Sequence, residues 1–187
     1  MSNDLTQLLV AARDGRSAAR ERLFDAAYPE LRRLASAQLR RHAANSTLHT
    51  TALVHEAYLE LFDQTRLATG DRVKFFGIAA RAMRQILVDH FRRASAQKRG
   101  GGAEHIDLDG QQVAAGVRGD MLLALDEALE RLEKISPRLA SVVENRFFGG
   151  MTEIEVAELL GVTDRTVRND WRKAKAWLAR ELGPETS

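Results

Sequence analysis

The sequence of 187 residues contains no cysteine, which excludes disulfide bonds and metal sites built on thiolates. It has no apolar run long enough to cross a bilayer. The start of the chain, Met1 to Asp4, lacks the basic residues and the apolar segment of a secretory signal peptide. These absences predict a soluble, cytoplasmic protein with no membrane partner.

Alternation of apolar and polar residues, the pattern of a β-strand, is also missing. Hydrophobic residues instead recur with helical spacing nearly everywhere, and no internal repeat is present. We therefore expect an all-α fold. In the N-terminal half the helices are expected at residues 5–14, 17–43, 48–63 and 73–93. Pro29 is a point where the second of these helices could be interrupted.

The predicted organisation is two small helical domains, residues 1–96 and 120–187, joined by a flexible linker over residues 97–119. The linker is rich in glycine and shows no sustained periodicity. Beyond it, leucines at helical spacing from Leu122 to Leu132 predict one helix. Ser136 followed by Pro137 predicts the start of the next.

Residues 152–178 have the pattern of a helix-turn-helix. Thr152 and Glu155 have the spacing of a capping box, and Gly161 stands where the chain must turn. Thr163 can cap a second helix, whose outward face is basic. Because such side chains suit base edges and phosphates in a major groove, the motif predicts DNA binding. The alternative is an ordinary amphipathic helix pair with a solvated basic face.

Charge is balanced overall, with a formal net charge of +2. Its distribution is uneven, because a basic cluster occupies residues 72–99 and a second one the C-terminal helix. Acidic residues gather elsewhere, at Glu127, Glu130 and Glu133. Two separated basic patches on a nearly neutral chain suggest two contact zones on a polyanion.

Nothing in the sequence predicts catalysis. The five histidines lack the spacing of metal ligands, and His55-Glu56 is not followed by a second histidine at the required offset. The Gly100-Gly101-Gly102 run lacks the Lys-Ser/Thr of a nucleotide-binding loop. We expect a protein that is not an enzyme and that uses no metal or other cofactor.

The whole arrangement resembles the extracytoplasmic-function (ECF) class of bacterial sigma factors, most strongly over Ser136 to Leu178. These factors join a region 2 helical domain to a region 4 helix-turn-helix domain. In that family the recognition helix reads the −35 promoter element. The resemblance implies that role for Arg165, Thr166, Arg168, Asn169 and Arg172, with Lys173 and Lys175 contacting phosphate.

The helix at 73–93 is similar to the family segment that opens and reads the −10 element. The side chains implied for this role are Phe75, Phe76, Arg81, Arg84, Gln85, Asp89, Arg92 and Arg93. Phe75 or Phe76 would be an aromatic platform for an unstacked base, although either could equally belong to the core. In the connection before this helix, Arg66, Thr69, Asp71 and Arg72 are candidates for capturing a flipped base.

Residues 53–59 are similar to the region 2 helix that docks on the clamp of the polymerase. The family pattern Asp-Leu-Val-Gln-Glu-x-Phe-Leu is altered here, with Ala52 in place of the acidic residue, His55 in place of glutamine and Tyr58 in place of phenylalanine. The resemblance implies a docking set of Leu53, His55, Glu56, Tyr58, Leu59 and Phe62. For each apolar member taken alone, a place in the core is the simpler interpretation.

The implied partners are core RNA polymerase, through the clamp region of its largest subunit and its flap, promoter DNA and, as a regulator, an anti-sigma factor. A stand-alone helix-turn-helix repressor or activator is the alternative, and a pure protein-interaction module is a third. A repressor needs only one DNA patch per protomer. The second basic cluster therefore favours the sigma factor.

Overall fold

A computed structural model describes residues 2–14, 17–42, 48–63, 70–100 and 111–183, and nearly all of them are helical. The predicted all-α fold is confirmed, and the described ranges contain no strand. The N-terminal half consists of α1 (Ser2–Arg13), α2 (Ser17–His42), α3 (Thr50–Asp63) and α4 (Arg72–Gly100). The C-terminal half consists of α5 (Gln111–Ile135), α6 (Pro137–Val143), the π-helical turn η1 (Glu144–Phe148), α7 (Glu153–Leu160) and α8 (Asp164–Glu181).

Two helices run further than the sequence predicts. α4 continues to Gly100 and α5 begins at Gln111, so both ends of the predicted linker are helical. The middle of that linker, residues 101–110, lies outside the described residues. α2 also passes through Pro29 without a break, because the proline is exposed and the carbonyl that loses its backbone donor there can bond to water.

The core of the N-terminal half lies between α2, α3 and α4. Its largest side chains are almost completely buried: Leu23, Leu31, Leu53, Phe75 and Leu87. Burial of one such side chain contributes about 1.5–3 kcal/mol. Asp71 caps α4, because its Oδ1 accepts the N–H groups of Val73 and Lys74 at 2.8 and 3.1 Å.

The helix-turn-helix forms as its local signals predict. The capping box is complete, since the Thr152 hydroxyl accepts the N–H of Glu155 and the Glu155 carboxylate accepts the N–H of Thr152. Gly161 ends α7 in the left-handed conformation, at a φ of 65°. Thr163 then caps α8 by accepting the N–H of Thr166.

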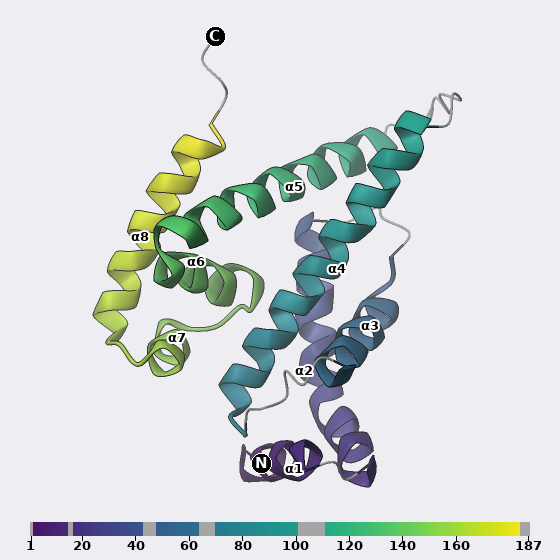
Figure 1. The fold of residues 1–187 in the computed structure, drawn as a ribbon, viewed down its shortest axis with the longest axis vertical. Helices are drawn as coiled ribbons and strands as arrows, with labels where there is room; N and C mark the ends of the chain where they lie inside the picture. Colours follow the sequence, from purple (N-terminus) through teal and green to yellow (C-terminus); the bar gives the residue numbers. More distant parts are fainter. Residues whose placement is uncertain (1, 15–16, 43–47, 64–69, 101–110, 184–187) are drawn as a thin grey trace.

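The two halves pack together, with α4 at the centre of the molecule (Figure 1). α2 and α3 contact one side of α4, and α5 and η1 contact the other. Glycine permits close contact between α4 and η1 and between α4 and α5. A Cβ on Gly77 would lie 2.7 Å from the Asn145 Oδ1, and one on Gly119 would lie 2.5 Å from the Phe91 ring. Within the described residues, no helix is both long and apolar enough to span a membrane.

Candidate nucleic-acid interface

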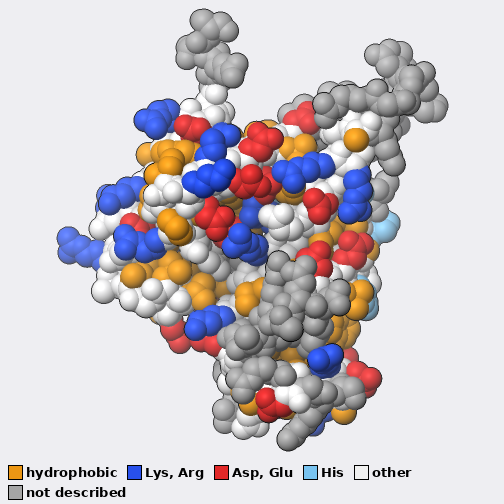
Figure 2. Space-filling view, in the orientation of Figure 1, with side chains coloured by type: hydrophobic (Ala, Val, Ile, Leu, Met, Phe, Trp, Pro, Cys, Tyr) orange, Lys and Arg blue, Asp and Glu red, His pale blue; other side chains and the backbone are white. Residues whose placement is uncertain are grey.

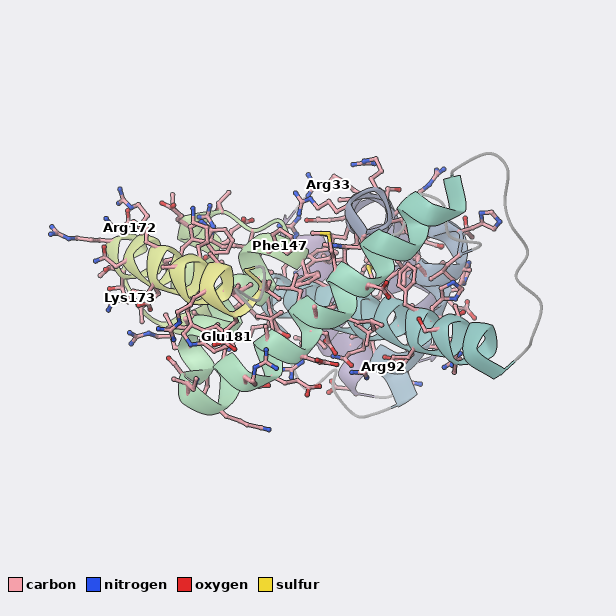
Figure 3. The ribbon with its side chains drawn as sticks, turned by 90° about the horizontal axis from the view of Figure 1, so that it is seen from above. Arg33, Arg92, Phe147, Arg172, Lys173 and Glu181 are labelled. Atoms are coloured by element: carbon pink, nitrogen blue, oxygen red, sulfur yellow. The ribbon has the colours of Figure 1, made fainter. Side chains whose placement is uncertain are left out.

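The outward face of α8 is strongly basic. Its buried face consists of Val167, Asp170, Ala174 and Leu178. The opposite face exposes Arg165, Arg168, Arg172, Lys173 and Lys175, with Thr166 and Asn169 half-buried between them. Arg172 and Lys173 point away from the rest of the molecule (Figure 3), and Figure 2 shows basic side chains over this edge. The predicted recognition residues therefore share one accessible surface.

Acidic and polar neighbours hold two of these arginines in place. Arg168 pairs with Glu153 of α7, where the Nε–Oε2 distance is 3.3 Å, and with Asp164 one turn earlier on α8. Arg172 donates to the Asn169 Oδ1. Arg168 thus reaches the surface already oriented, because two carboxylates from different helices fix its guanidinium.

The predicted −10 residues of α4 divide into two groups. Asp89 and Arg93 are exposed. Arg81, Arg84 and Arg92 form ion pairs with carboxylates of α5 and η1, and Gln85 lines the same cleft between the halves. Arg81 and Arg92 are nevertheless about half exposed. Arg84 is only 3% exposed, so it cannot contact DNA in this arrangement.

Phe75 and Phe76 are buried, at 1% and 5% exposure, and they pack edge to face. A base cannot stack on either ring here, because both rings are buried. Of the loop candidates, Arg66 and Thr69 lie outside the described residues. Asp71 caps α4, and Arg72 pairs with Glu30 while lying 5.3 Å above the Phe76 ring.

The predicted docking set on α3 also divides. Leu53 is fully buried, and Tyr58 packs on Phe24 while its hydroxyl donates to the Arg20 carbonyl at 2.5 Å. Leu59 is 67% exposed, and His55 and Glu56 are exposed beside it. Phe62 lies in α3, but its side chain is outside the described ones. Only part of the predicted docking set is therefore accessible.

Burial shifts the pKa of three groups. Burial, with a smaller effect from Arg41, lowers the pKa of His42 to about 4, so this side chain is neutral where it contacts the rings of Phe147 and Phe148. Burial raises the pKa of the Tyr58 hydroxyl. Burial also raises the pKa of Asp126, against the opposing effect of Arg84 and then of Arg92.

Sequence reasoning missed several acidic partners of the arginines on α4 and α8, among them Asp126, Glu144 and Glu153. A signal existed for Asp126, because it stands between Leu122 and Leu129 on the apolar stripe of α5. A carboxylate at such a position must have a partner. Among the described residues, no group of three or more His, Asp or Glu side chains could hold a metal ion.

These helices define an all-α protein with a helix-turn-helix and a basic recognition helix, a class that binds DNA. The sequence model of the family described as "ECF sigma factor" matches residues 2–183, so the chain belongs to the ECF sigma factors. A comparison with curated proteins found no match. Membership gives the chain a role in transcription initiation, with RNA polymerase and promoter DNA as its partners.

Proposed function

We propose that this chain directs core RNA polymerase to a specific set of promoters by docking through α3, engaging the −10 element through α4 and reading the −35 element through α8. The observation that carries the proposal is the accessible basic face of α8, presented by a fully capped helix-turn-helix. The chain itself performs no chemistry, because phosphoryl transfer belongs to the polymerase. It acts where the polymerase acts, in the cytoplasm.

Reading of the −35 element depends on α8 entering the major groove. Arg165, Arg168 and Arg172 can each present two donors to a guanine, whereas Lys173 and Lys175 carry point charges suited to phosphate. Phosphate contacts set position and salt dependence, and base contacts set sequence.

Engagement of the −10 element depends on α4 and on the connection before it. Asp89 and Arg93 are accessible for this role, while Arg81, Arg84 and Arg92 must first leave their acidic partners. Docking rests on the exposed side chains His55, Glu56 and Leu59 of α3, and this helix lies on the side of the molecule away from α6–α8 (Figure 1).

Run-off transcription with purified bacterial core polymerase tests the whole proposal. The first template is the DNA upstream of the chain's own gene, because many sigma factors of this class drive their own expression. A discrete transcript that depends on the added chain is expected. Neither a transcript nor co-elution with core polymerase would favour a stand-alone helix-turn-helix regulator instead.

Replacing Arg168 by alanine should weaken binding to the cognate promoter by about 1–3 kcal/mol and relax the choice of base at one position. The reason is that a guanine would lose a donor pair that Glu153 and Asp164 hold in place. Binding to promoter variants by fluorescence anisotropy measures both effects.

Lys173→Ala is the matched control, because Lys173 is an exposed cation on the same helix. It should weaken all sequences alike and reduce the slope of log affinity against log salt by about 1. If Arg168→Ala behaved in the same way as this control, Arg168 would be a phosphate contact and not a base reader.

A further inference from the structure

One arginine of the α8 face differs from its neighbours in its electrostatic surroundings. Arg168 forms ion pairs with Glu153 of α7, at an Nε–Oε2 distance of 3.3 Å, and with Asp164 of α8, at an Nη2–Oδ2 distance of 2.5 Å. Within the described part of the chain, Arg165 and Arg172 form no ion pair, although both are exposed on the same face. Arg168 thus carries a charge that neighbouring carboxylates offset.

The carboxylate of Glu153 is itself held between two arginines. Its Oε2 faces Arg168, and its Oε1 lies 3.0 Å from Nη1 of Arg146 in η1. The Arg146 guanidinium lies 5.3 Å from the ring centroid of Trp171 on α8. The side chains of Arg146 and Glu153 are only 23% and 32% exposed, so water screens their attraction less than that of a fully exposed pair. η1, α7 and α8 together therefore fix the position of Glu153.

Glu153 shares a groove with the predicted base readers. α7 packs beside α8 (Figure 1), and the two helices border an open groove of about 510 Å³. The side chains that line this groove are Glu153, Arg165, Arg168, Asn169, Trp171 and Arg172. DNA bound to these arginines would therefore also lie close to the Glu153 carboxylate.

The two ion pairs leave one end of the Arg168 guanidinium for DNA. Nε and Nη2 form its side edge, and each of them faces a carboxylate. The donors that remain are those of Nη1 and the second hydrogen of Nη2, at the tip of the side chain. This pair fits the N7 and O6 acceptors of a guanine. It fits two oxygens of a phosphate equally well, so geometry alone does not select a base over the backbone.

Charge can make that selection. A guanine edge is neutral, whereas a phosphate is an anion that would lie beside two carboxylates. Specificity is a difference between affinities, and it can come from repulsion of the wrong partner. We infer that Glu153 is a specificity-determining residue, which orients Arg168 toward a base and repels backbone phosphate, so that it weakens binding to random DNA more than binding to the recognised sequence. This inference rests on the role of α8 in the proposed function.

Binding of the full chain to duplex DNA tests the inference. A library of duplexes with a randomised segment is enriched by binding to the unmutated chain, and the enriched duplex is then compared with random duplex at one fixed salt concentration. Glu153→Gln removes the charge and keeps the size of the side chain. It should bind random duplex about fivefold more tightly, the effect of one unit charge close to a phosphate in water. Its affinity for the enriched duplex should stay the same or fall, so the ratio of the two affinities falls by about fivefold or more.

Glu158→Gln is the matched control. Glu158 is exposed on the same helix and lies outside the set of residues that line the groove, so the change in net charge is equal but the ratio of affinities should not change. Asp164→Asn removes the second carboxylate and should lower the ratio, as Glu153→Gln does. It also replaces Glu153→Gln if circular dichroism shows that this variant does not fold.

A second readout asks whether Glu153 acts through Arg168. Sequencing of the enriched library gives the base preference at each position. Glu153→Gln should weaken the preference at the position that Arg168 reads, and it should have no such effect in an Arg168→Ala background, because coupled residues are not additive. Glu153→Asp keeps the charge on a shorter side chain. It should weaken the same base preference but leave the affinity for random duplex close to that of the unmutated chain.

The outcomes separate this inference from the proposed function. A chain that enriches no sequence would overturn the reading of DNA by α8 and the role of Glu153 with it. An enriched sequence together with an unchanged ratio in Glu153→Gln and Asp164→Asn would overturn the inference alone. An equal loss of base preference in the Arg168→Ala background would also overturn it, because Glu153 would then act through another side chain.

Discussion

Phe75→Ala should lower the free energy of unfolding by about 3–5 kcal/mol, the cost of truncating a buried phenylalanine. The ring is 1% exposed and packs edge to face on Phe76, so its removal leaves a cavity between α4 and the neighbouring core. Urea denaturation followed by circular dichroism measures the effect. We expect a lower midpoint with an unchanged slope.

The result distinguishes a core residue from a platform for a flipped base. Lys74→Ala is the matched control, because Lys74 is the exposed neighbour on the same turn of α4, and its loss should change stability by no more than about 0.5 kcal/mol. A Phe75→Ala protein as stable as this control, but unable to form an open promoter complex, would contradict the core assignment and support the platform.

The helix-turn-helix is the part of the fold that the sequence predicts most closely. Its signals are local, because Thr152 and Glu155 are three residues apart and Gly161 and Thr163 act on their own neighbours. The outward face of α8 follows from helical periodicity alone. Capping and helical periodicity depend only on neighbouring residues and not on distant contacts, so both can be predicted from the sequence.

The contacts between the halves could not be predicted in the same way. Arg84 and Asp126 are 42 positions apart, and Gln38 and Phe148 are 110 apart. No periodic pattern specifies which face of α4 meets α5. The glycine content of residues 97–119 also favoured a linker, yet helix continues into both ends of that segment. One of its glycines, Gly119, is where α5 approaches Phe91.

Family resemblance overestimated the accessible sites for a related reason. It assigns residues by their position in a motif. It does not distinguish the side chains that contact a partner from those that are buried in the core beneath them. Leu53 and Phe75 occupy motif positions but are buried, while Leu59, for which the core was the simpler interpretation, is exposed. The docking prediction therefore narrows to His55, Glu56 and Leu59, the members of the predicted set that are exposed.

Glu56→Arg should weaken binding to core polymerase by about 2–5 kcal/mol or more, enough to abolish a complex at ordinary assay concentrations. The substitution places a bulky charge of the opposite sign between His55 and Leu59, on the face that α2 and α4 leave open. Glu56 is exposed, so the fold should persist, and circular dichroism checks this. Size-exclusion co-elution and fluorescence anisotropy with labelled protein measure the loss.

Glu127→Arg makes the same charge change at an exposed position of α5 and serves as the control. It should keep polymerase binding, because α5 contacts the side of α4 opposite to α3 (Figure 1). Equal loss in both variants would mean that net charge, not the α3 face, governs the interaction. Full binding by Glu56→Arg would place the docking surface elsewhere.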